Sequence, residues 1–180
     1  MIKDENHIII NSTLTESEMR QISNRDYTMQ DEQNRLENFL KEVNIEYDRN
    51  YMRMEKGPKP FFYKALTLSY QLRHTILEFY FLVFTEDSII LLTQDKEYEF
   101  TTNNMVKINH HDIQDFSFQK IYGAYCIFFE YQNKEYYFYL NDSFSTRVLG
   151  NVFGTDKIDY SRKNLSYLET MNFMGLLKSR

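Results

Sequence analysis

The clearest hydrophobic pattern in the chain is a pair of apolar runs, at residues 79–84 and 89–92, with polar residues between them. Glu86 and Asp87 fit the turn of an antiparallel hairpin. The facing pairs in that hairpin are Phe84 with Ile89, Leu82 with Leu91, Val83 with Ile90 and Phe81 with Leu92. A strand that faces water on one side alternates apolar and polar residues, whereas both surfaces of this hairpin are apolar. The pattern therefore predicts a hairpin that is covered on both faces.

Further strands are predicted at short intervals after this hairpin. Their approximate ranges are 96–101, 105–109, 113–118, 124–131 and 134–140. Gln132 and Asn133 fit a tight turn between the last two strands, because Asn tolerates a positive φ. In that register one surface pairs Ile127 with Phe138 and Phe129 with Tyr136, and the other pairs Cys126 with Tyr139 and Phe128 with Tyr137. The sequence therefore predicts a meander of short antiparallel strands.

Helical spacing appears on both sides of the strand region. Residues 12–45 are predicted to form two helices, the first opened by a capping box of Thr15 and Glu18 and the second capped by Thr28. The second helix carries an apolar stripe of Leu36, Phe39, Leu40 and Val43. A short helix is expected at about 64–74. A final helix, capped by Asp159, carries the stripe Leu165, Leu168, Met171, Met174 and Leu177.

The best candidate for a boundary is the only proline-containing stretch, where Gly57 precedes Pro58 and Pro60. We therefore divide the chain into an N-terminal helical extension, residues 1–57, and a sheet domain, residues 58–180, with residues 44–60 as a connector. Helices that flank a run of antiparallel strands predict the α+β class.

Composition and charge narrow the function classes. Hydrophobic residues make up 42% and charged residues 26%, which is the balance of a folded domain. The net charge of −5 disfavours nucleic acid and anionic membranes as partners, since basic surfaces normally bind both. The single Cys excludes an internal disulfide, and no apolar run is long enough for a signal peptide or a membrane span. We expect a soluble, cytoplasmic protein.

Three segments resemble the bacterial branch of the pleckstrin-homology (PH) superfold. "FLVFTEDSIILLT" is similar to the entry hairpin of that family, "VKINHHDIQDFSFQ" to its strand, polar-Asp-Ile step and next strand, and "YCIFFEYQNKEYYFYL" to its closing hairpin. The resemblance covers approximately residues 75–140. We apply the name PH-like domain to the whole sheet domain, residues 58–180. It implies an antiparallel barrel or bent sandwich with a C-terminal helix, which binds protein, peptide or lipid and is usually not an enzyme. An NTF2-like cone remains the alternative fold.

Candidate chemistry is sparse. His110, His111 and Asp112 lie together, but adjacent residues on a strand point to opposite faces and do not readily serve one metal. Cys126 lies in an apolar strand, where a buried, inert thiol is commoner than a nucleophile. No phosphate-binding loop or nucleophile elbow is present. We therefore expect no enzymatic activity, no cofactor and no metal.

Two surfaces are candidates for binding. Cys126, Phe128, Tyr137 and Tyr139 would form an aromatic patch for a protein partner, unless the stripe of the N-terminal helix covers them. Lys157, Arg162 and Lys163 form the densest basic cluster and are candidates for binding an anion. The favoured function is a binding or scaffolding module for another protein or a second copy. The alternatives are a small-molecule binder or enzyme on an NTF2-like fold, and a peripheral lipid-binding module.

Overall fold

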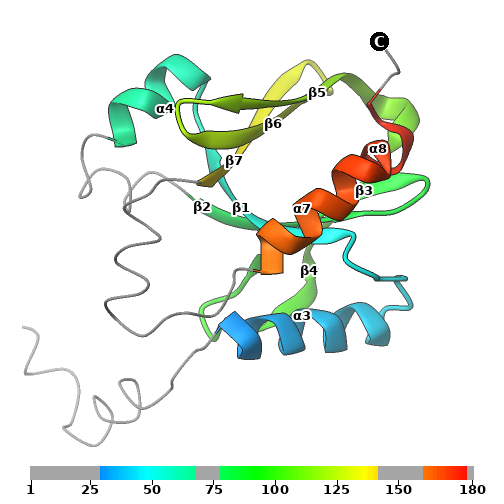
Figure 1. Cartoon of the computed structure of the whole chain (residues 1–180). Helices are drawn as coiled ribbons and strands as arrows, with labels where there is room; N and C mark the ends of the chain where they lie inside the picture. The colour runs from blue at the N-terminus through cyan, green and yellow to red at the C-terminus, as the bar shows by residue number, and fades with distance from the viewer. Residues whose placement is uncertain (1–28, 68–77, 142–159, 178–180) are drawn as a thin grey trace, which may run out of the picture.

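The computed structural model describes residues 29–67, 78–141 and 160–177, and these form one antiparallel sheet with helices packed on it (Figure 1). The strands are β1 (Tyr51–Gly57), β2 (Glu78–Phe84), β3 (Ser88–Gln94), β4 (Phe100–Asn109), β5 (Ile113–Ile121), β6 (Ala124–Tyr131) and β7 (Lys134–Asn141). The helices are α3 (Met29–Glu42), α4 (Pro60–Thr67), α7 (Tyr160–Thr170) and α8 (Asn172–Gly175), with a 3-10 turn, η1, at His110–Asp112.

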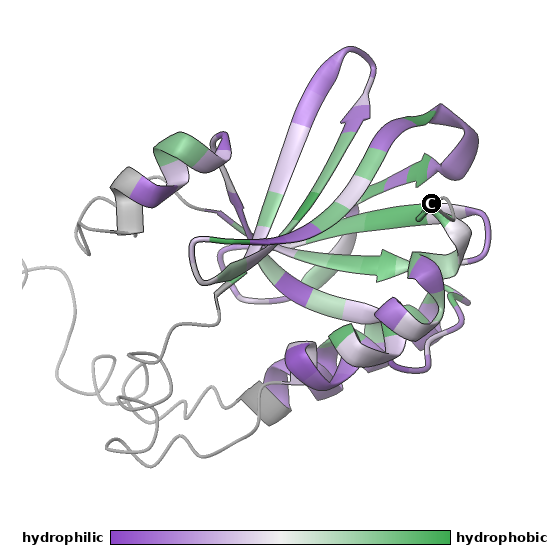
Figure 2. Ribbon diagram, turned by 45° about the horizontal axis from the view of Figure 1, so that its top comes forward, coloured by the Kyte–Doolittle hydropathy of each residue, from purple (hydrophilic) through white to green (hydrophobic). Residues whose placement is uncertain are grey.

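The seven strands follow the order β4-β3-β2-β1-β7-β6-β5, and every described pairing is antiparallel. The α+β class is therefore confirmed. Within the described strands β4 and β5 each have one paired neighbour, so they are the two edges and the sheet is not a closed barrel. Figure 2 shows hydrophobic colouring concentrated along the strands and hydrophilic colouring at the turns.

The β2–β3 hairpin has the predicted register and is covered on both faces, as its pattern indicated. On one face Leu82 and Phe84 belong to a core with residues of β6, β7, α7 and α8. On the other face Phe81 and Val83 pack under Leu36, Leu40 and Phe39 of α3. Both apolar surfaces therefore exist because two different cores share the hairpin.

A polar seam holds α3 and α7 against β1. The Tyr160 hydroxyl donates to the buried Glu32 carboxylate at 3.0 Å, and Arg53 lies 3.6 Å from the same carboxylate. The Asn164 amide donates to the Tyr51 carbonyl at 2.8 Å. Glu32 and Asn164 are buried and paired, whereas the buried Arg53 Nε has no hydrogen-bond partner in the described structure. The pairings of Glu32 and Asn164 specify how the two helices lie on the strand.

The C-terminal stripe does not continue as one helix, which corrects the prediction. α7 ends at Thr170, and Asn172, Phe173 and Met174 have φ of 49°, 49° and 56°, the left-handed region. That backbone is costly for non-glycine residues. It turns the Phe173 ring into the core against Phe84 and Phe118, at centroid distances of 5.4 and 4.9 Å. Burying this ring offsets the local cost.

Two other assignments were wrong. Residues 51–57 are not a connector but β1, which lies between β2 and β7, so a boundary after Gly57 separates a central strand from its own sheet. Of the strands predicted at 96–101 and 105–109, residues 96–98 form a turn after β3, and residues 100–109 form one strand, β4, with an irregular register opposite Leu92 and Gln94.

Some predictions are only partly covered by the structure. The short helix expected at about 64–74 begins earlier, at Pro60, and is described as far as Thr67. The capping box of Thr15 and Glu18, the cap at Thr28 and the cap at Asp159 lie outside the described residues.

Candidate interaction surfaces

The outer surface of β6 and β7 is the surface on which the sequence placed a partner patch. Tyr63 of α4 stacks on Tyr139 with ring centroids 3.6 Å apart and planes within 6°. The Tyr139 hydroxyl donates to the Pro58 carbonyl at 2.6 Å, and the Tyr63 hydroxyl donates to Glu55 at 3.2 Å. Stacking and hydrogen bonds together fix α4 over this part of the sheet.

This cover divides the predicted patch. Cys126 and Tyr139 are both 0% exposed beneath α4. Phe128 and Tyr137 remain half-buried, and their ring centroids lie 4.8 Å apart. Burial raises the pKa of the Cys126 thiol to about 12, which fits the inert thiol expected from the sequence. The cover comes from α4 and not from α3, because α3 lies over β2 and β3.

The edge of β5 that has no paired neighbour among the described strands is a second surface, and the β5–β6 register defines which backbone groups face away from β6. Tyr122 and Gly123, with φ of 51° and 79°, form a two-residue turn between β5 and β6. Residues next to such a turn exchange hydrogen bonds, and the pattern alternates along the strands. Ser117 and Gln119 therefore bond to β6, whereas Phe118 directs its N–H and C=O outward.

Aromatic side chains flank this edge. Phe116 and Phe118 are both half-buried, and each lies against the buried ring of Phe173, at 5.6 and 4.9 Å. Asp115, with φ of 51°, lies in the bulge where the β5 register shifts. The edge thus combines outward backbone groups with partly exposed apolar surface, the two features that an added strand uses.

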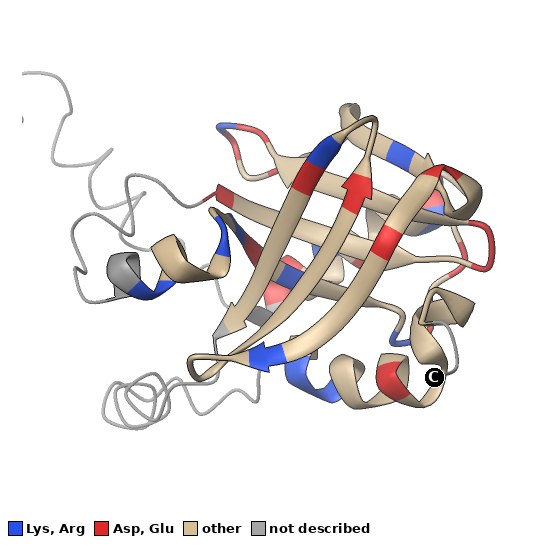
Figure 3. Cartoon of the chain, turned by 90° about the horizontal axis from the view of Figure 1, so that it is seen from above, with Lys and Arg blue, Asp and Glu red and all other residues tan. Residues whose placement is uncertain are grey.

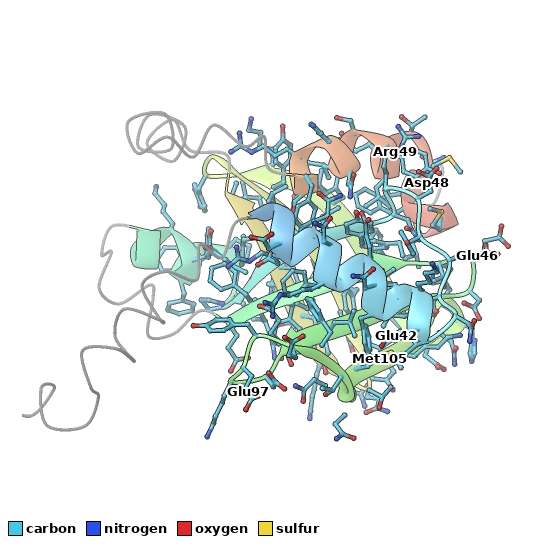
Figure 4. All side chains as sticks on the ribbon, turned by 90° about the horizontal axis from the view of Figure 1, so that it is seen from below. Glu42, Glu46, Asp48, Arg49, Glu97 and Met105 are labelled. Atoms are coloured by element: carbon cyan, nitrogen blue, oxygen red, sulfur yellow. The ribbon has the colours of Figure 1, made fainter. Side chains whose placement is uncertain are left out.

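A groove of about 760 Å³ lies between the connector from α3 to β1, the β2–β3 turn and the α7–α8 junction. Its apolar lining comes from Ile45, Tyr47, Phe84, Tyr167, Met171 and Met174. Its charged lining comes from Lys41, Glu46, Asp48 and Glu86. Figure 4 shows Glu46, Asp48 and Arg49 following one another along the connector, on the side away from Glu97. Sequence reasoning missed this groove because three separate segments build it.

The basic cluster is only partly described. Lys157 lies outside the described residues, and Arg162 and Lys163 lie in the first turn of α7, half-buried and exposed respectively. Figure 3 shows Lys and Arg interspersed with Asp and Glu over the face in view. These observations do not join the three residues into one site.

The histidine pair lies in η1. His111 Nε2 is 3.2 Å from Asp112, whereas the buried His110 Nε2 has no hydrogen-bond partner in the described structure. Burial lowers the pKa of His110. Among the described residues, no group of three or more His, Cys, Asp and Glu side chains is arranged to hold a metal ion. None of the described helices is both long and apolar enough to cross a membrane.

Assignment of function therefore depends on these surfaces. Among the described strands β5 offers an open edge, the groove offers an apolar floor with a charged rim, and half of the predicted aromatic patch, Cys126 and Tyr139, is beneath α4. No protein-family model matches the chain, and no curated protein matches it.

Proposed function

We propose that the chain is a non-enzymatic, cytoplasmic protein-binding module of PH-like fold, which captures an extended segment of a partner protein on the free edge of β5. The strand order β4-β3-β2-β1-β7-β6-β5 and a helix, α7, that follows the last strand and packs on β1 support the PH-like assignment. The resemblance of the two hairpin segments agrees with it.

The free edge of β5 carries the proposal. An added strand gains affinity from main-chain hydrogen bonds and specificity from side chains that alternate between pockets. The outward N–H and C=O of Phe118 supply the main-chain hydrogen bonds. The partly exposed rings of Phe116 and Phe118 supply apolar contact for the side chains of the added strand. A second copy of the chain could supply such a strand as well as a different protein.

The two alternatives have less support. A small-molecule site on an NTF2-like cone needs a hollow interior, but here Phe173 and Leu168 fill the core between the strands and the C-terminal helices. A lipid-binding module needs a basic surface, and the net charge is −5. A melting temperature that rises with small ligands, or vesicle binding at physiological salt, would favour these alternatives.

The test uses peptides selected from a random display library on the immobilised full chain. Replacing Phe118 by phenyllactic acid converts one amide to an ester, so the ring stays and the outward N–H is lost. We expect the affinity of the selected peptides to fall about ten-fold, the worth of one unmade hydrogen bond. As a control, Tyr122 in the β5–β6 turn is replaced by hydroxyphenyllactic acid, which should leave affinity unchanged. Equal affinity for both esters and the parent protein would refute strand addition at Phe118.

A further inference from the structure

The groove between the α3–β1 connector, the β2–β3 turn and the α7–α8 junction is a preformed feature of the fold. The buried Asn50 amide donates to the Phe84 carbonyl at 2.6 Å and to the Glu46 carbonyl at 3.2 Å. At the end of α3, Asn44 takes the left-handed conformation with φ of 57°, and the Ile45 N–H donates to the Leu40 carbonyl at 2.8 Å. The connector wall is thus hydrogen-bonded to the sheet and to the helix end.

The floor of the groove is apolar and partly open to solvent. Met171 is 43% exposed, and Met174, Tyr167 and Tyr47 are half-buried. Methionine side chains are flexible and polarizable, so they adapt to varied apolar groups. The groove volume of about 760 Å³ lies within the range of ligand-binding clefts, roughly 300–1,000 Å³.

The rim carries unbalanced negative charge. Within the described residues, neither Glu46 nor Glu86 has an ion-pair partner, whereas Asp48 lies 3.4 Å from Arg49. The neighbouring Asp87 contrasts with them, because Lys107 lies 3.1 Å from its carboxylate. Lys41 is the one cation in the described lining, against three carboxylates.

One cation beside the groove already lies over an aromatic ring. The Arg49 guanidinium lies 4.6 Å from the centre of the Tyr167 ring, next to the Asp48 carboxylate. A guanidinium or ammonium group gains from a ring face and a carboxylate together. The same combination continues into the groove, where Tyr47 and Glu46 line the connector side.

We propose that this groove binds a short segment of a partner protein in which apolar residues are flanked by Lys or Arg. The apolar side chains would lie on Met171 and Met174, and the basic ones would reach Glu46 and Glu86. Charge disfavours the chain's own residues 1–28 as the occupant, because they contain more acidic than basic side chains. This site is separate from the β5 edge and does not depend on it.

The test uses a fluorescein-labelled, 12-residue peptide of alternating Leu-Leu and Lys-Lys pairs as the probe, with a Glu-for-Lys version as a second probe. The variant is Glu46→Lys with Glu86→Lys, and the matched control is Glu97→Lys with Glu130→Lys, outside the groove. Each double reversal adds +4 to the net charge of −5, so both variants carry −1. The two variants therefore differ in where the charge is removed and not in how much.

We expect the groove variant to bind the Lys probe about ten-fold more weakly than the parent protein and the control variant to stay within about two-fold. The Glu probe should bind the parent protein more weakly than the Lys probe. In NMR spectra, the methyl signals of Met171 and Met174 should shift on saturation with the Lys probe.

Equal weakening by both variants would overturn the proposal, since net charge alone would then explain binding. Unshifted methionine methyl signals at saturation would overturn it as well. Sedimentation in which only the groove variant loses self-association would identify a second copy as the occupant and also contradict the partner proposed here. Because the Phe118 ester leaves the groove intact, it should not change Lys-probe affinity, which separates failure of this site from failure of the β5 edge.

Discussion

The position of α4 makes Cys126 a reporter of local opening. Tyr63 is 0% exposed and stacks on Tyr139, and Cys126 belongs to the same buried cluster. The flanking aromatic side chains of α4, Phe61 and Phe62, are exposed. Tyr63 is therefore the aromatic ring that anchors this helix to the strands, and Tyr63→Ala should release α4 while the two larger cores remain.

The magnitude follows from the buried ring. Truncating a buried aromatic side chain to Ala costs about 3–5 kcal/mol, of which the ring stacking is about 0.5–1.5 kcal/mol. If about 3 kcal/mol is lost from the docking of α4, the population of the open helix rises about 150-fold. Thermal unfolding should change less than this cost implies, because local opening does not require the whole fold to unfold.

The assay is the rate at which Cys126 reacts with a disulfide reagent at pH 8 under native conditions. The chain has a single Cys, so the signal has one source. Burial raises the pKa of its thiol to about 12, so we expect slow labelling of the parent protein. Tyr63→Ala should label about a hundred-fold faster, and Phe62→Ala, at a ring that is 59% exposed, should label at the parent rate.

Two results would refute this reasoning. Labelling of Tyr63→Ala at the parent rate would show that the ring does not control access to the thiol. Global loss of the circular dichroism signal in Tyr63→Ala would show that α4 and the sheet unfold as one unit.

Three further predictions concern the cores and the pH dependence. Phe173→Ala should lower the free energy of unfolding in urea by about 3–5 kcal/mol, because the ring is buried among other aromatic rings; a loss below about 1 kcal/mol would contradict its place in the core. Tyr160→Phe should cost about 1–3 kcal/mol, since the buried Glu32 loses a donor, and an unchanged urea midpoint would show that the bond is absent. Burial lowers the pKa of His110 below its ordinary 6.5, so the folded state favours the neutral ring. The contribution of the neutral ring to folding stability is therefore present above pH 6.5 and is lost as the pH falls. Urea unfolding at pH 7.5 and 5.5 should show a smaller difference for His110→Gln than for the parent, and an equal difference would contradict this.

The features that the sequence predicted well are local. The β2–β3 and β6–β7 registers were correct because period-2 patterns meet at short turns; Gln132 and Asn133 do adopt positive φ, of 51° and 59°. The α3 stripe of Leu36, Phe39 and Leu40 was correctly assigned as a buried face. In each case the neighbours in space are also neighbours in sequence, or share a repeating pattern.

The features that were missed depend on tertiary contacts. β1 mixes Met with Arg, Glu and Lys, and its central position is visible only once both of its neighbours are known. The break after α7 depends on the core that receives Phe173. The partner patch at Cys126 and Tyr139 was misjudged because its cover, Tyr63, lies in a segment whose helical pattern is weak.

The central claim is that β5 presents an open edge for strand addition, and amide hydrogen exchange by NMR tests it most directly. In the free protein, the amides of Ser117 and Gln119 should be protected by their bonds to β6, and that of Phe118 should exchange much faster. Addition of a selected peptide should protect Phe118 and leave the other two unchanged. Equally slow exchange at all three amides in the free protein would show that the edge is already occupied and would contradict the account.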